Sequence, residues 1–204
     1  AQIKIENSTL SEGQLKAEVN IQNQAGHKLP SAYPSRRAWI HLAVYDGDNT
    51  LIFESGKLNT DGSIEGNDND SDPDLFEPHY TKIEKPEEVQ IYEGILAGPE
   101  DEVTTVLLTA VRYIKDNRLL PSGFDKGTAS SDVAVHGAAE GDPDFLGGSD
   151  RVRYSVGVGS AEPPFHVVAE LWYQPIGYRW AKNLGEYDTQ ESAQFLSFFD
   201  EMAS

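Results

Sequence analysis

The sequence predicts an all-β fold, and three observations lead to this prediction. The 204 residues include 18 glycines and 11 prolines, which is typical of a chain with many turns. Apolar residues make up 38% of the chain and aromatic residues 10%, which is enough for a substantial core. Several short segments alternate between apolar and polar residues, as strands with one buried face do.

The first half of the chain contains the clearest strands. Residues 14–23 alternate strictly between apolar and polar side chains, which predicts a strand with one solvated face. Residues 2–6 are expected to pair with it as a short lead-in strand. Residues 38–45 are apolar on both faces and predict a buried strand, which a turn at 46–49 connects to a strand at 51–53.

The second half continues the β pattern between two long loops. The loops are expected at 59–79 and 115–149, and loops of this length are usually functional or disordered. The remaining predicted strands are 88–93, 103–114, 151–158 and 166–174. The total of about seven or eight strands favours an immunoglobulin-like β-sandwich with long loops.

The end of the chain changes to a helical period. Phe195 and Phe199 recur at helical spacing, so we predict a C-terminal helix over 189–202. We therefore expect a β-sandwich domain over 1–188 and a helix in 189–204. That helix either packs on the sandwich or docks onto a partner.

Charge and cysteine content exclude several classes of function. The formal net charge of −18 disfavours nucleic acid and anionic membranes, and it favours cations and basic partner proteins. The absence of cysteine excludes disulfides, iron–sulfur clusters and covalently attached c-type haem within the chain. No apolar run is long enough to span a membrane. The start at Ala1 suits a mature exported protein or an excised domain, and a trimmed chain would look the same.

The acidic loop at 59–79 contains a candidate calcium site. Alternating carboxylates can converge on Ca²⁺, which takes six to eight oxygen ligands. The candidate ligands are Asp68, Asp70, Asp72 and Asp74. The pattern departs from an EF-hand, because Pro73 and His79 stand where glycine and glutamate belong. The alternative is a solvated acidic loop without an ion.

The five histidines show no zinc-hydrolase spacing. His41 and His166 lie in predicted strands and are expected to be structural. His27 and His79 lie in loops beside glycine or proline, and both are candidate metal or haem ligands. Because no nucleophile elbow, P-loop or dinucleotide motif occurs either, we expect a protein that is not an enzyme.

Aromatic residues near the C-terminal end give a second binding hypothesis. A rigid aromatic platform could bind a polysaccharide or a partner protein. The candidates are Trp172, Tyr173, Tyr178 and Trp180. Strand alternation places Trp172 and Tyr173 on opposite faces, so one of the two is expected in the core.

Several segments together resemble a known family. They are Asn23 through Trp39, Glu77-Pro78-His79, Val89 through Glu93, Lys115 through Phe124, Gly147 through Asp150 with Tyr154, and Leu171 through Gln174. In this order they resemble the haem-free β domain of exported multihaem c-type cytochrome family proteins. The resemblance spans about residues 20 to 180, and the chain departs from such proteins in having no haem-attachment motif.

The resemblance implies a periplasmic or extracellular accessory domain beside a c-type cytochrome domain or subunit. The family's Gly-His-Leu-Pro loop matches Gly26, His27, Leu29 and Pro30, which makes His27 a candidate ligand to a neighbouring haem. Arg36 and Arg37 are candidate partners of haem propionates, with ordinary ion pairs as the alternative. Two other functions stay open: a calcium-stabilised carbohydrate-binding β-sandwich, and a hydrolase with paired carboxylates.

Overall fold

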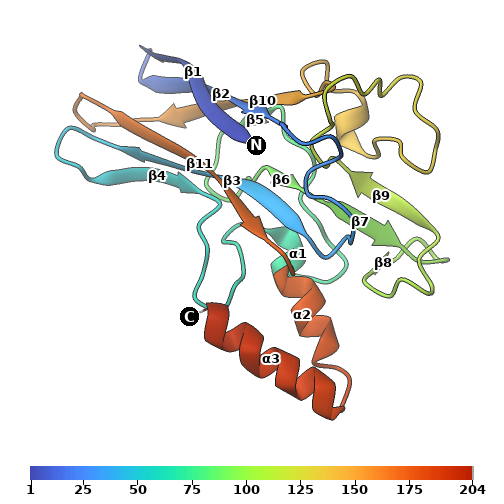
Figure 1. Cartoon of the computed structure of the whole chain (residues 1–204). Helices are drawn as coiled ribbons and strands as arrows, with labels where there is room; N and C mark the ends of the chain where they lie inside the picture. The colour runs from blue at the N-terminus through green and yellow to red at the C-terminus, as the bar shows by residue number, and fades with distance from the viewer. Residues whose placement is uncertain (204) are drawn as a thin grey trace.

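Two β-sheets face each other in the computed structural model, which describes residues 1–203 (Figure 1). The first sheet has the order β1-β2-β10-β5. Its strands are β1 (Gln2–Ser11), β2 (Gln14–Gln22), β10 (Ser149–Gly157) and β5 (Lys82–Ile83). All neighbours are antiparallel except β5, which runs parallel to β10.

The second sheet has the order β11-β3-β4, and a short strand, β6, also pairs with β3. Its strands are β11 (His166–Gln174), β3 (Arg37–Tyr45), β4 (Leu51–Ser55) and β6 (Ile91–Tyr92). β3 is buried along almost its whole length because β11 lies on one side of it, and β4 and β6 lie on the other.

A third, smaller sheet and three helices complete the fold. The sheet consists of β8 (Val103–Thr104), β7 (Gly94–Ala97) and β9 (Arg112–Asp116). The helices are α1 (Asp68–Ser71), α2 (Tyr178–Leu184) and α3 (Gln190–Ala203), with a 3₁₀ turn at Ala138–Glu140. α3 lies beside α2, away from the two large sheets (Figure 1).

The main core fills the space between the first two sheets. Alternate residues of β2 and β10 meet alternate residues of β3 there, as the period of two in these strands requires. The core includes Leu15, Val19, Ile21, Ile40, Leu42, Val44, Val152, Tyr154 and Val156. A second cluster around Trp39, Ile64, Val89 and Ile91 covers the other face of the second sheet.

The predicted all-β sandwich and C-terminal helix are confirmed, whereas the predicted strand at 103–114 is wrong and the one at 88–93 is found only at Ile91–Tyr92. Residues 103–114 do not form one strand, because residues 105–111 leave the sheet between β8 and β9. Leu108 in this segment is 98% exposed. The run mixes apolar residues with threonines and one arginine without strict alternation, so its sequence does not specify a buried face. None of the helices within residues 1–203 combines the length and the apolar character that crossing a membrane needs.

Candidate functional sites

His27 presents one ring nitrogen to solvent. The side chain is exposed, and its Nδ1 lies 3.0 Å from the carbonyl oxygen of Lys28. Because a carbonyl can only accept, Nδ1 carries the proton and donates it. Nε2 of the neutral ring then has a bare lone pair, and it has no hydrogen-bond partner within residues 1–203. This is the tautomer that a metal ligand needs.

The backbone around His27 is held in place by contacts to a distant segment. The Asn23 side-chain amide donates to the His27 carbonyl at 2.8 Å and to the Leu119 carbonyl at 3.0 Å. Leu29 and Leu119 also exchange two backbone hydrogen bonds, at 2.9 and 2.8 Å. His27 therefore sits on an anchored loop, which lowers the entropy lost on binding.

Positive charges near this loop converge on a buried carboxylate. Lys28 Nζ lies 2.8 Å from Asp116 Oδ2, and Arg118 Nη2 lies 2.7 Å from the same oxygen. Burial raises the pKa of Asp116, but the hydrogen bonds and charges of Arg118 and Lys28 outweigh it and leave the pKa below its usual value. Burial also lowers the pKa of Lys28. Both cations are thus engaged inside the protein.

The two arginines predicted to meet haem propionates have different environments. Arg36 is half-buried and donates from Nη1 to the Ser31 carbonyl at 3.1 Å. Arg37 is 3% exposed and binds both oxygens of Asp70, at 2.7 and 3.0 Å. Its Nε also donates to Gln174 at 2.7 Å. Arg36 can reach a ligand at the surface, whereas Arg37 is occupied within the domain.

The predicted calcium ligands do not converge. Asp70 points into the protein toward Arg37, while Asp68, Asp72 and Asp74 are exposed. The reason is that residues 68–71 form the short helix α1, in which a step of two residues turns a side chain to the opposite side. Alternate carboxylates would share one face of an extended strand, but they do not share one face of a helix.

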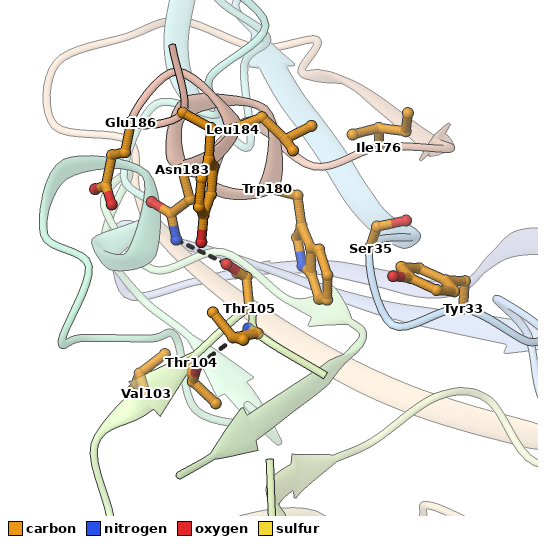
Figure 2. Close-up of a pocket in the computed structure, with 12 residues that line it drawn as sticks. Tyr33, Ser35, Val103, Thr104, Thr105, Ile176, Trp180, Asn183, Leu184 and Glu186 are labelled. Atoms are coloured by element: carbon orange, nitrogen blue, oxygen red, sulfur yellow. Dashed lines mark hydrogen bonds between the residues drawn. The ribbon is translucent and has the colours of Figure 1, made fainter. Parts of the chain in front are cut away.

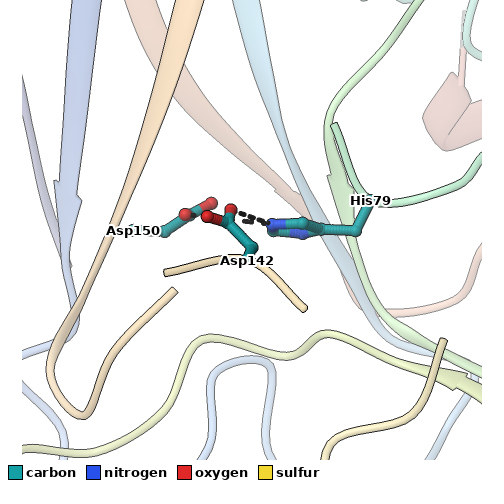
Figure 3. A group of neighbouring side chains, drawn as sticks. All are labelled: His79, Asp142 and Asp150. Atoms are coloured by element: carbon teal, nitrogen blue, oxygen red, sulfur yellow. Dashed lines mark hydrogen bonds and ion pairs between the residues drawn. The ribbon is translucent and has the colours of Figure 1, made fainter. Parts of the chain in front are cut away.

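His79 is buried in a cluster that resembles a metal centre (Figure 3). Its Nε2 lies 2.9 Å from Asp142 Oδ2 and 3.9 Å from Asp150 Oδ1. One potential ligand atom from each residue lies within 4.8 Å of the other two. The His79 side chain is 1% exposed, so it cannot reach a haem outside the domain, and an internal ion is the ligand to consider.

The hydrogen bonds of His79 disfavour a metal at Nε2. Gln90 Nε2 and Asn117 Nδ2 both donate to His79 Nδ1, at 2.8 and 3.1 Å. Each amide is held in this orientation, because its oxygen accepts a backbone N–H, from Tyr80 and Glu93 respectively. Nδ1 therefore has no proton, and Nε2 carries one and donates it to Asp142. A metal at Nε2 would require the ring to lose this proton while Nδ1 has none, which would leave an imidazole without any N–H proton. The residues therefore do not fit a metal centre.

Asp150 completes a hydrogen-bonded hub around His79. Tyr92 donates its hydroxyl to Asp150 at 2.7 Å, and burial raises the pKa of Asp150 above its usual value. Burial raises the pKa of Asp142 too, but the hydrogen bond from His79 and further contacts lower it overall. The hub joins residues next to β6, β9 and β10 and so connects the three sheets. Sequence reasoning missed Asp142 and Asp150, and no local pattern marks them.

The four predicted platform aromatics do not form one surface. Trp172 packs edge-on against Trp39 at 5.8 Å in the second cluster, and Tyr173 is exposed on β11. Tyr178 lies under Lys182 Nζ at 5.0 Å. Trp180 instead lines a separate pocket between α2, β8 and the 33–35 segment (Figure 2).

Comparison with known proteins supports the fold. No family model and no curated protein matches the chain. A solved structure, that of a penta-heme cytochrome c552 from Thermochromatium tepidum, matches with a TM-score of 0.50 and 15% sequence identity. The match covers 90% of this chain and 34% of that protein. This chain thus shares its fold with about a third of a multihaem cytochrome.

Proposed function

We propose that this chain is a non-catalytic accessory domain of a multihaem c-type cytochrome system. In this role it presents His27 as an axial ligand to a haem that another domain or subunit carries. The observation that carries the proposal is the exposed His27 ring, whose Nδ1 is bonded to the Lys28 carbonyl and whose Nε2 is bare. The fold shared with part of a penta-heme cytochrome supports the haem as the partner.

The surroundings of His27 support the same role. A haem ligand must hold its position when the partner is absent, and the bonds from Asn23 and Leu119 to the loop provide this. Arg36 lies on the same loop segment and has guanidinium nitrogens beyond the one that binds Ser31, so it is a suitable partner for a propionate. A haem system of this kind implies a periplasmic or extracellular location.

The test is a spectroscopic titration with a haem c peptide that has one open axial position. We expect the chain to convert this haem to a low-spin spectrum, with a shift of the Soret band. His27→Ala should weaken the binding at least tenfold, because the exposed imidazole that the anchored loop presents is removed. His166→Ala is the matched control, since His166 is also exposed but stands on strand β11. Equal losses in the two variants would refute a specific role for His27.

We propose no second function. The carbohydrate-binding alternative depended on calcium bound by the Asp68–Asp74 stretch and on an aromatic platform. Asp70 is bound to Arg37 and Trp172 is packed against Trp39, so no observation on residues 1–203 favours that alternative.

A further inference from the structure

The pocket beside α2 has a composition that selects one class of ligand. Its volume is about 370 Å³, within the range of small-molecule sites. Three aromatic residues line it, namely Tyr33, Trp180 and Tyr187. Tyr33 and Trp180 meet edge to face with ring centroids 5.5 Å apart, so the two rings form a corner of the pocket (Figure 2).

The charge in the pocket is negative. Glu186 is the single charged residue of the lining, and its carboxylate has no hydrogen bond or ion pair within residues 1–203. No lysine or arginine lines the pocket. The net charge of −18 adds a field that attracts cations. A ligand here is therefore cationic, and this pocket is separate from the haem contact proposed at His27.

Among the polar side chains of the pocket, Asn183 offers its carbonyl oxygen as an acceptor. Asn183 donates its amide to the Thr105 hydroxyl at 2.9 Å, which leaves the Asn183 side-chain oxygen without a donor. The rest of the lining is largely apolar, including Val103, Val106 and Ile176. A small ammonium ion that needs many hydrogen bonds would lose more hydration here than it regains. Methyl groups on the cation suit these walls better.

We propose that this pocket binds a small alkylated ammonium compound. The cation lies against the faces of Trp180, Tyr33 and Tyr187, where the ring quadrupoles attract positive charge. Glu186 balances its charge from the rim, and the valine and isoleucine side chains contact its alkyl groups. The inference goes beyond the accessory role, because it depends neither on a haem nor on His27.

The test uses choline and its neutral isostere 3,3-dimethylbutan-1-ol, which has the same shape without the charge. Binding is measured by calorimetry and by quenching of tryptophan fluorescence in the full chain. We expect choline to bind at least tenfold more tightly than the isostere. Trp180→Leu should abolish binding, and Glu186→Gln should weaken it several-fold. Tyr173→Leu, an exposed aromatic on β11 outside the pocket, should leave it unchanged.

Several results would overturn the proposal. Equal binding of choline and the isostere would show a merely apolar pocket. Tighter binding of methyl glucoside than of choline would show a sugar site, and no choline binding at 50 mM would exclude a cation site. Trp180→Phe retains an aromatic face and serves as the second variant if Trp180→Leu fails to fold. Binding that Glu186→Gln does not weaken but that 0.5 M salt abolishes would place the cation elsewhere on the acidic surface.

Discussion

Removing Asp70 should destabilise the protein far more than removing any neighbouring carboxylate. Asp70 accepts two bonds from Arg37 and one from the backbone N–H of Ile64 at 2.7 Å. Both partners of the ion pair have side chains only 4% exposed. Asp70→Ala therefore leaves a guanidinium buried without its counter-ion, at a cost of about 3–5 kcal/mol.

Urea unfolding of a double-mutant cycle measures this effect. Arg37→Ala should cost a similar amount, because it leaves the Asp70 carboxylate buried with the Ile64 bond alone. The double variant should lose less than the sum of the two single losses, by up to about 3 kcal/mol. Asp68→Ala is the matched control, since Asp68 is exposed on the same helix, and we expect a change within about 0.5 kcal/mol.

Two results would refute the reasoning. Single losses that simply add in the double variant would show that the pair is not coupled. A rise in the urea midpoint with millimolar Ca²⁺ that Asp68→Ala and Asp72→Ala both abolish would restore a calcium site in this loop. We expect Ca²⁺ to leave the midpoint unchanged.

Three further variants test other parts of the fold. Asp116→Asn should be less stable than the original protein in urea unfolding near pH 7, and this difference should shrink below about pH 4. The reason is that the pKa of Asp116 is lower in the folded than in the unfolded protein, so ionised Asp116 stabilises the native state, and this contribution disappears as pH falls through the folded pKa. A difference that stays constant from pH 7 to pH 3 would contradict this. Tyr154→Phe should leave the free energy of unfolding unchanged or raise it by up to about 1 kcal/mol, because the buried Tyr154 hydroxyl has no hydrogen-bond partner among the described residues. A clear fall in the melting temperature would show that this hydroxyl is hydrogen-bonded. Gly56→Ala should cost about 1–3 kcal/mol, because φ is +77° there and a Cβ would lie 2.5 Å from the Ile40 carbonyl oxygen; an unchanged melting temperature would refute the strain.

The strand predictions were correct where a segment has one solvent-exposed face or is apolar along its whole length. β2 matches the predicted 14–23 segment, because its period of two is a direct consequence of strand geometry. β11 coincides with the predicted 166–174 segment, which is rich in valine and aromatic residues. The prediction of one strand over 103–114 failed because a largely apolar run without strict alternation does not distinguish a strand from a surface loop. The helix α2 was not predicted, since its seven residues are too few to show a helical period.

The candidate sites were less predictable than the strands, because their contacts join distant segments. The Arg37–Asp70 ion pair joins an arginine that the sequence predicts as a haem contact and a carboxylate that it predicts as a calcium ligand. The hub around His79 brings together side chains from five separate segments, including Gln90, Asn117, Asp142 and Asp150. Of the two candidate histidine ligands, both predicted in loops beside glycine or proline, His27 lies at the surface and His79 is buried, because such residues indicate a loop but not its exposure.

The pairing of β2 with β10 has a consequence for how the chain folds during synthesis. Gln14 pairs with Gly157 and Gln22 with Ser149, so residues 23–148, more than half of the chain, lie between the two strands. At about 5–20 residues per second, a ribosome needs roughly ten seconds to supply β10 after β2 has emerged. During that time β2 has β1 along one edge, but its other edge lacks its partner strand β10. The interval is a window for chaperone binding, and slow synonymous codons between the two strands would lengthen it.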